Sequence, residues 1–229
     1  MYRCGYISVV GRPNAGKSSF INSMVGQKVA IVSPKAQTTR NNILGIYNDG
    51  KNQFIFVDTP GIHKAKNNLD KFMMKNVRAS IEDVDLILYA IDGTKPFDNE
   101  ELDYIDNLTN KGNVIVLVTK IDIANKNKLF AELVKLNNLK IKDILCIDSK
   151  TKKGFDEVLK VLEKYIPESE EKNFVYEEDD YTDKSVRFIV GEIIREKTLL
   201  FLNDEIPHGI AIDVRSFEET DKFIEIFAD

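Results

Sequence analysis

Short, mostly apolar runs alternate with stretches of helical spacing along most of the chain. Apolar runs bounded by polar or glycine-containing residues are typical of buried strands, and they occur at residues 6–10, 43–47, 53–57, 86–91, 114–118 and 144–147. Apolar residues that recur every three to four positions predict helices at residues 20–25, 71–81, 99–109, 129–136 and 155–165. Strands that alternate with helices predict an α/β fold with three layers and a mostly parallel, six-stranded sheet. The second and third strands are an exception, because the Asp49-Gly50 turn between them predicts a β-hairpin.

The pattern changes after Pro167, where residues 168–180 are acidic and have no period. We interpret this stretch as a linker between a domain of residues 1–167 and a second unit of residues 181–229. The formal charge changes at the same boundaries, from +6 in the first domain to −6 in the linker and −5 in the second unit. Because nucleic-acid surfaces are normally basic, we expect the second unit to bind RNA poorly, and we expect no DNA partner.

The second unit has its own pattern. Residues 186–201 have the spacing of an amphipathic helix, Pro207–Gly209 predicts a turn, and the runs 210–214 and 223–227 predict two strands. One helix and one hairpin bury too little apolar surface for an independent core. We therefore expect a small, truncated α+β unit.

Composition narrows the class of protein. Hydrophobic residues make up 43% of the chain, enough for a sizeable core, and no apolar run is long enough to predict a membrane span. The first strand follows Met1 so closely that we expect no signal peptide. Cys4 and Cys146 lie in or beside predicted strands, and we interpret them as free thiols in a reducing cytosol. These features predict a cytoplasmic protein.

The stretch Gly11–Ser19, with the sequence GRPNAGKSS, matches the pattern G-x-x-x-x-G-K-[ST]. It follows a predicted strand and precedes a predicted helix, which is the context of a phosphate-binding loop rather than of a chance glycine turn. Gly11 and Gly16 allow the backbone to curl so that N–H groups point at phosphate oxygens. Lys17 is predicted to reach the β- and γ-phosphates, and Ser18 is predicted to bind Mg²⁺.

A second motif, D-T-P-G, begins at Asp58 and ends the strand at 53–57. An aspartate in this place can reach Mg²⁺ through water, and the N–H group of Gly61 can contact a γ-phosphate. D-x-P-G alone is more often an ordinary turn, but its place after the second strand from a phosphate-binding loop favours a γ-phosphate sensor. Thr39, in the polar loop before the hairpin, is the candidate for a second hydroxyl on Mg²⁺.

A third motif, T-K-I-D, begins at Thr119 and predicts which nucleotide base the site binds. The carboxylate of Asp122 can accept two hydrogen bonds from guanine, whereas adenine would leave it unsatisfied. The stem of Lys120 can lie along the base plane. The usual first residue of this motif is Asn, and Thr119 keeps a hydroxyl but loses the amide. In the loop after the last strand, the backbone N–H of Ser149 is predicted to cap the carbonyl oxygen of guanine.

The motifs G-R-P-N-A-G-K-S, Q-T-T-R, D-T-P-G and T-K-I-D occur in this order. In this respect the chain resembles the Era family of bacterial ribosome-assembly GTPases, from about Tyr6 to the end. The string E-I-I-R-E-K at Glu192–Lys197 resembles Era proteins rather than their relatives. Era proteins join a Ras-like GTPase domain to a C-terminal KH domain that binds the 3′ end of small-subunit ribosomal RNA. They often attach loosely to the inner face of the cell membrane.

The resemblance implies a P-loop GTPase domain and a partial KH-like domain, hydrolysis of GTP to GDP, and a nucleotide switch in assembly of the small ribosomal subunit. Its partners would be that subunit and its 16S-type rRNA. Nucleotide contacts would fall on Asn14, Ala15, Gly16, Lys17, Ser18, Ser19, Thr119, Lys120, Asp122, Ser149 and Lys150. The resemblance places Mg²⁺ on Ser18, Thr39 and Asp58, and catalytic roles on Lys17, Thr39 and Gly61.

The resemblance also bears on monovalent cations. Relatives of the Era family bind K⁺ near the phosphates, and Asn14 is the candidate ligand here. Ras-type GTPases place a water-orienting Gln directly after the D-x-x-G motif, where this chain has Ile62. Asn14 has a second interpretation, as a residue that only shapes the loop.

Two further functions stay open at this point. One is a nucleotide-controlled binding module with negligible intrinsic hydrolysis. The other is a P-loop phosphotransferase, against which guanine recognition by Asp122 argues. A KH domain clamps nucleotides with a G-x-x-G loop, and no such string follows Gly154. His63 and His208 lie in predicted turns, and we expect both to be solvated.

Overall fold

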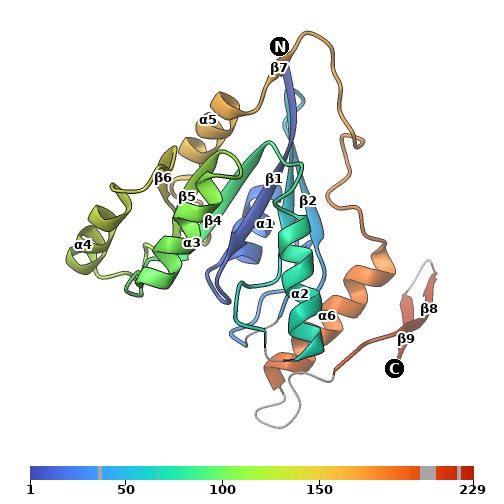
Figure 1. Ribbon diagram of the computed structural model, residues 1–229. Helices are drawn as coiled ribbons and strands as arrows, with labels where there is room; N and C mark the ends of the chain where they lie inside the picture. Colours follow the sequence, from blue (N-terminus) through green and yellow to red (C-terminus); the bar gives the residue numbers. More distant parts are fainter. Residues whose placement is uncertain (36–37, 66, 202–209, 221–222) are drawn as a thin grey trace.

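The computed structural model describes residues 1–35, 38–65, 67–201, 210–220 and 223–229. Most of it is a sheet with helices on both faces (Figure 1). The strands of this sheet are β1 (Tyr2–Gly11), β2 (Ile43–Asn48), β3 (Asn52–Asp58), β4 (Leu86–Asp92), β5 (Val114–Thr119), β6 (Asp143–Cys146) and β7 (Glu168–Ser169). The helices are α1 (Lys17–Val25), α2 (Asn68–Ala79), α3 (Asn99–Thr109), α4 (Lys126–Leu136) and α5 (Phe155–Tyr165).

The strands lie in the order β2-β3-β1-β4-β5-β6, and the two-residue β7 pairs with the start of β1. All neighbours from β3 to β6 are parallel. Only β2 and β7 run antiparallel to their partners, β2 through the hairpin at Asp49-Gly50. The predicted α/β fold with a mostly parallel sheet of six strands is confirmed, and β7 is a short addition to it.

Each strand sends alternate side chains to opposite faces, so the sheet has two cores. On one face Ile7 and Val9 pack with α1 and α5, and Phe20 lies between the rings of Phe56 and Phe155. On the other face Val10 and the alternate residues of β4 and β5 pack with α2, α3 and α4. Burial on both faces explains why these strands are continuously apolar in sequence.

Three helices begin three residues earlier than their apolar spacing predicts: α1, which starts directly after the phosphate-binding loop at Lys17, and α2 and α4. The side chain of Asn67 accepts from the backbone N–H of Asp70 and forms a capping box, so α2 begins at Asn68 and not near residue 71. Asn125 likewise caps α4, whose first turn is polar and exposed. None of the helices in the described ranges combines the length and the hydrophobicity that crossing a lipid bilayer requires.

The acidic stretch after α5 leads from β7 to α6 along one side of the sheet (Figure 1) and is hydrogen-bonded to it at several points. The amide of Gln53 on β3 donates to the carbonyl oxygen of Tyr176 at 2.8 Å and accepts from the N–H of Val175 at 2.8 Å. Further along, Ile46 on β2 donates its N–H to the carbonyl oxygen of Tyr181 at 2.9 Å. We refer to residues 168–183 as the strap, because they contact β1, β3 and β2 in turn and lead to α6.

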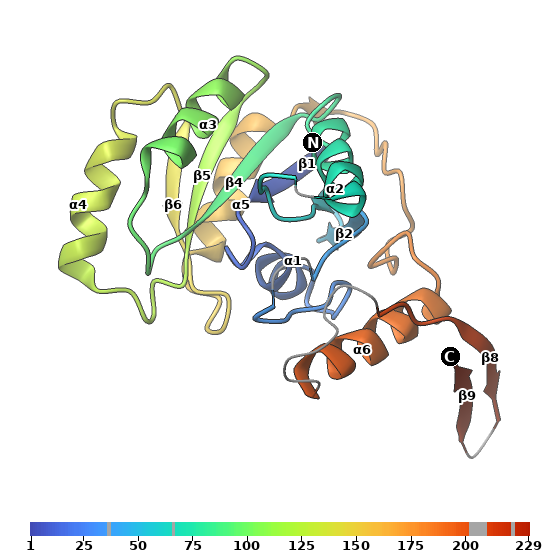
Figure 2. The ribbon, with the colours of Figure 1, turned by 60° about the horizontal axis from the view of Figure 1, so that its bottom comes forward.

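The second unit consists of α6 (Val186–Phe201) and a hairpin of β8 (Val214–Glu219) and β9 (Ile224–Ala228). Figures 1 and 2 both show α6 beside the loop that follows α1, with the hairpin further out. The helix agrees with its predicted bounds, but the prediction of a strand at 210–214 is wrong. The carbonyl oxygen of Ile210 accepts from Arg40, and Ile212 lies near Gly191 of α6, so pairing begins only at the end of this run. The predicted turn at 207–209 and His208 lie outside the described residues.

The packing of Phe20 against the rings of Phe56 and Phe155 can be tested by mutation. Phe20 is fully buried, whereas Phe130 on α4 is 71% exposed. Phe20→Ala is expected to lower the free energy of unfolding by about 3–5 kcal/mol, because it removes a large buried side chain and leaves a cavity. Phe130→Ala, the same change on the surface, is expected to change it by less than about 0.5 kcal/mol. Urea denaturation of both variants measures the difference, and equal losses would contradict this description of the core.

Candidate nucleotide-binding site

The loop between β1 and α1 has the backbone that a phosphate-binding loop needs. Gly11 has a φ of 147°, and a Cβ atom there would lie 2.2 Å from the carbonyl oxygen of Ala90. Gly16, which caps α1, has a φ of 87°, and Asn14 also has a positive φ, of 61°. Left-handed conformations strain most L-residues, so only glycine fits easily at the two ends of this loop. The loop therefore curls directly over the N-terminus of α1, where N–H groups attract anions.

Lys17 is the first residue of α1, and its side chain folds back over the loop. Its Nζ atom donates to the carbonyl oxygens of Gly11 and Arg12, both at 3.1 Å. Burial lowers the pKa of Lys17 to about 8, against the opposing influence of the Asp58 carboxylate. The ammonium group is thus held inside the loop, where a phosphate would neutralise it.

Three oxygen-bearing side chains from distant parts of the sequence converge beside Lys17. Ser18 donates its hydroxyl to Oδ2 of Asp58 at 2.7 Å, and the hydroxyl of Thr39 lies 3.2 Å from that of Ser18 and 3.4 Å from the same Oδ2. Asp58 is fully buried, and its Oδ1 atom has no hydrogen-bond partner among the described residues. Burial raises the pKa of Asp58 to about 6, although the Lys17 ammonium acts to lower it. Two hydroxyls and an incompletely satisfied carboxylate fit a Mg²⁺ ion, which prefers oxygen ligands.

The D-T-P-G motif is tied to the phosphate-binding loop. Thr59 donates its hydroxyl to the carbonyl oxygen of Val9 at 2.8 Å, and Ile62 donates its N–H to the carbonyl oxygen of Gly11 at 2.9 Å. A Cβ atom at Gly61 would lie 2.6 Å from the backbone of Pro13, so this approach requires glycine. Gly61 therefore lines the same cavity as the loop, as the sequence predicts.

The T-K-I-D motif reaches the loop from the end of β5. Thr119 donates its hydroxyl to the carbonyl oxygen of Ala15 at 2.8 Å, so the hydroxyl alone keeps a contact with the loop. Lys120 donates to the carbonyl oxygen of Asn14 and to the carboxylate of Asp92, both at 2.7 Å. Sequence reasoning missed Asp92, although it ends β4 at the same edge of the sheet, where the carboxyl ends of parallel strands meet.

The loop after β6 lies beside Asp122 and contacts α1. The Nζ atom of Lys150 lies 3.5 Å from the Asp122 carboxylate. Ser149 accepts at its carbonyl oxygen from the hydroxyl of Ser23 on α1, at 2.7 Å. Asp148 accepts from the N–H of Lys150 at 2.9 Å and from Thr151, which shapes the turn. Asp148 thus organises this loop through its side chain.

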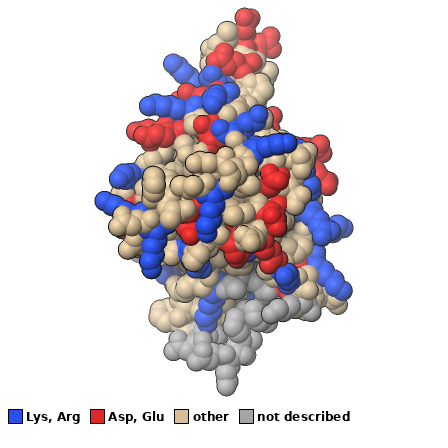
Figure 3. Space-filling model, turned by 60° about the vertical axis from the view of Figure 1, so that its left-hand side comes forward, with Lys and Arg blue, Asp and Glu red and all other residues tan. Residues whose placement is uncertain are grey.

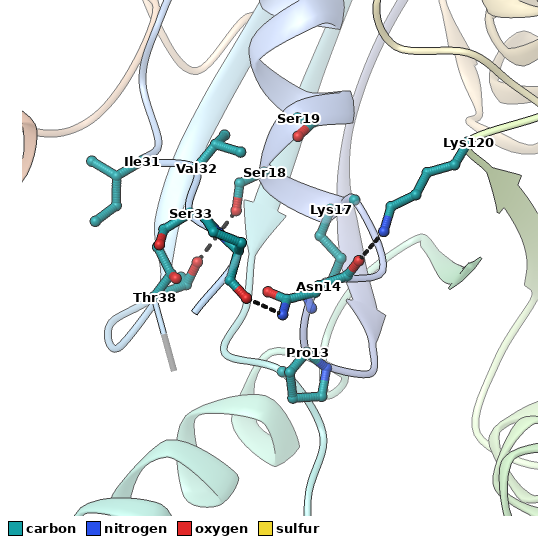
Figure 4. A pocket seen from close by; sticks show the side chains of 14 residues that line it. Pro13, Asn14, Lys17, Ser18, Ser19, Ile31, Val32, Ser33, Thr38 and Lys120 are labelled. Atoms are coloured by element: carbon teal, nitrogen blue, oxygen red, sulfur yellow. Dashed lines mark hydrogen bonds between the residues drawn. The ribbon is translucent and has the colours of Figure 1, made fainter. Parts of the chain in front are cut away.

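The loop between α1 and β2 forms the opposite wall of a cavity of about 230 Å³ (Figure 4). Asn14 spans this cavity and donates its Nδ2–H to the carbonyl oxygen of Pro34 at 2.6 Å. The lining residues are Pro13, Asn14, Gly16, Lys17, Ser18, Ser19, Ile31, Val32, Ser33, Pro34, Thr38, Thr39, Gly61 and Lys120.

The expectation that His63 is solvated is wrong. Its ring nitrogens lie 2.6 Å from the carbonyl oxygen of Gly61 and 2.9 Å from the carboxylate of Asp70, which is itself buried. The side chain of His63 is 20% exposed. Nothing in the local sequence indicates this contact, because it depends on where α2 begins.

Comparisons with known proteins agree with this geometry. Residues 6–120 match the family of 50S ribosome-binding GTPases. GTPase Era of Clostridioides difficile is 41% identical, over 95% of this chain and 73% of its own length. GTPase Era of Halothermothrix orenii is 38% identical, over 96% of this chain and 74% of its own length.

Solved structures give the same result. An Era in complex with MgGDPNP and nucleotides 1506–1542 of 16S ribosomal RNA has a TM-score of 0.89 and 32% identity, covering 100% of this chain and 78% of its own. A single-residue variant of Aquifex aeolicus Era bound to GDP·AlF4⁻ has the same TM-score and identity over 99% of this chain and 78% of its own. With the phosphate-binding loop, the convergent hydroxyls and the T-K-I-D motif in one site, these similarities establish that the chain belongs to the Era family of GTPases.

Proposed function

We propose that this GTPase binds GTP and Mg²⁺ in the cavity beside α1, hydrolyses GTP to GDP, and acts as a nucleotide switch in small ribosomal subunit assembly. The observation that carries the proposal is the convergence of Ser18, Thr39 and Asp58, which lie far apart in sequence, within 3.4 Å of one another. This arrangement occurs at the carboxyl ends of the neighbouring strands β1 and β3. Such an edge is the usual ligand site of an α/β sheet.

Each residue then has a role that follows from its position. Ser18, Thr39 and Asp58 would hold Mg²⁺, and a bound Mg²⁺ would neutralise charge on the phosphate oxygens. Lys17 would exchange its carbonyl partners for the β- and γ-phosphates, and the N–H groups from Asn14 to Ser19 would cradle them. The N–H of Gly61 would contact the γ-phosphate, which makes the D-T-P-G loop sensitive to hydrolysis.

The base would lie between the stem of Lys120 and the loop after β6. Asp122 would accept two hydrogen bonds from guanine, and the N–H of Ser149 would donate to the guanine carbonyl oxygen. Lys150, close to Asp122, would close this end of the site.

We assign residues 1–167 to the GTPase domain, 168–180 to a connecting segment and 181–229 to a partial KH-like domain. The relative solved with 16S ribosomal RNA supports the small subunit rRNA as the partner. On the side of the molecule that lies at the left in Figure 1, basic and acidic side chains are interspersed (Figure 3), which gives little support to a nucleic-acid site there. We place the protein in the cytoplasm, with loose attachment to the inner face of the membrane.

Guanine specificity tests the proposed function directly. Asp122→Asn is expected to weaken GTP binding by about 2 kcal/mol or more, because a charged acceptor for two guanine donors is lost. The same change is expected to improve binding of xanthosine triphosphate, whose base has an oxygen in place of the 2-amino group. Titration of both nucleotides measures the switch, with Asp106→Asn on the exposed face of α3 as the control. An unchanged preference for guanine would rule out the assignment of Asp122.

Ile62 stands where Ras-type GTPases have a water-orienting Gln, so we expect a monovalent cation to assist hydrolysis instead. Asn14 uses Nδ2 to contact Pro34, so Oδ1 is the amide oxygen that would contact a K⁺ ion beside the phosphates. Oxygen cages discriminate by ion size, so GTP turnover is expected to be faster in KCl than in NaCl at equal ionic strength. Asn14→Ala is expected to remove most of this difference. If Asn14 only shapes the loop, both salts will give equal rates and the variant will lower the two together.

RNA binding by this chain is expected to be weak, because residues 181–229 carry a formal charge of −5 and contain no G-x-x-G string. Filter binding at fixed salt against a 3′-terminal small-subunit RNA fragment measures it, with a scrambled fragment as the control. Submicromolar, salt-sensitive and sequence-dependent affinity would show that another surface of the chain binds the RNA.

A further inference from the structure

Two charged residues of α6 are buried, which is unusual on a helix at the surface of a protein. Arg195 and Glu196 are each 4% exposed, whereas their neighbour Lys197 is exposed. Buried charges are costly unless they are paired or hydrogen-bonded. The partners of both side chains lie largely in the loop between α1 and β2, which forms one wall of the nucleotide cavity.

Glu196 holds the first part of this loop. Its Oε1 atom accepts from the backbone N–H of Val32 at 2.9 Å, and its Oε2 atom forms an ion pair with Lys28. Val32 lines the cavity. Glu196 therefore fixes the backbone of the loop from outside the site, on the side away from the phosphates.

Arg195 holds the last part of the same loop. Its Nη2–H group donates to the carbonyl oxygen of Thr38 at 2.7 Å, while Glu192 accepts from Nε at 2.8 Å and from Nη2 at 2.6 Å. Glu192 thus orients the guanidinium toward the loop. Thr38 directly precedes Thr39, whose hydroxyl completes the proposed Mg²⁺ site. A shift of the Thr38 carbonyl would move Thr39 with it, because the two share one peptide unit.

We propose that Arg195 and Glu196 are positioning residues for GTP hydrolysis, which act through Thr38 and Val32 and set the place of Thr39. The inference rests on the proposed function, because the proposed function assigns Thr39 to the Mg²⁺ site. It makes α6 part of the nucleotide site although no residue of α6 lines the cavity. Because coupling between two sites is reciprocal, a change of the loop on hydrolysis also acts on α6.

Arg195→Met and Lys197→Met make a matched pair for the test. Both remove one positive charge from α6 and introduce the same side chain, but among the described contacts only Arg195 reaches the loop. Single-turnover GTP hydrolysis is measured at increasing Mg²⁺ concentration, with GTP and GDP affinities from titration of fluorescent nucleotides. Arg195→Met is expected to raise the Mg²⁺ concentration for half-maximal hydrolysis about tenfold, the loss of one hydrogen bond from a charged donor. GDP affinity is expected to stay unchanged, because a γ-phosphate is needed to order such a loop.

Two further variants separate positioning from stability. Glu196→Gln keeps the volume and one acceptor oxygen but loses the ion pair with Lys28, so a smaller shift in the same direction is expected even if Arg195→Met folds poorly. In the background of Thr39→Ala, the Arg195→Met change is expected to have no further effect on the Mg²⁺ dependence, because the group it positions is gone.

The inference is overturned if Arg195→Met and Glu196→Gln match Lys197→Met in Mg²⁺ dependence and in the ratio of GTP to GDP affinity, or if the effects of Arg195→Met and Thr39→Ala add. A lower melting temperature with unchanged Mg²⁺ dependence would mean a structural role and would also overturn it. Failure of the unaltered chain and of Lys197→Met to bind or hydrolyse GTP would instead refute the proposed function.

Discussion

The buried carboxylate of Asp58 is the constraint on which the site depends. It lies at the end of β3 with no exposed surface, and one of its oxygens has no partner among the described residues. Its burial opposes its own ionisation, as burial of Lys17 nearby opposes protonation of the amine. Each charge partly offsets the cost of the other, but a cation at Asp58 and an anion at Lys17 would do so more completely. These buried groups are therefore suited to a metal–phosphate complex, at a cost in stability that functional sites commonly carry.

Parallel topology explains how so many chemical groups reach one place. β1, β3, β4 and β5 all end at the same edge, so the phosphate-binding loop, Asp58, Asp92 and Thr119 are brought together without any sequence proximity. Contacts between these strand ends then fix the details. Thr119 and Lys120 hold the carbonyl oxygens of Ala15 and Asn14, so the base motif also supports the phosphate motif.

Periodicity and local motifs were enough to predict the sheet, the hairpin and the bounds of α3, α5 and α6, because these depend on near neighbours in sequence. Local sequence signals were insufficient where a contact with a residue outside the local pattern sets the boundary of an element or the environment of a side chain. The start of α2 depends on a capping box with Asp70. The first residues of the run 210–214 contact Arg40 and α6 and therefore do not pair as a strand. The side chain of Gln53 forms hydrogen bonds with the strap. Within the site, the motifs predicted which residues line the cavity at Lys17, Ser18, Thr39 and Gly61. They could not reveal Asp92, His63 or Arg195, whose contacts are 28, 7 and 157 residues distant along the chain.

The second unit is joined to the GTPase domain in two physically different ways. The strap contacts the edge of β2 at two N–H groups: that of Ile46 donates to the carbonyl oxygen of Tyr181, and that of Leu44 donates to the carboxylate of Asp183. These contacts occupy part of an edge with which other strands could pair. The contacts of α6 instead fall on a loop that carries Thr39 and whose described residues form no helix or strand. A strand edge in a packed sheet has one arrangement, whereas a loop held by side chains can adopt two at modest cost. A change in this loop would therefore reach α6 through Arg195 and Glu196, whereas the contacts of the strap do not involve the loop.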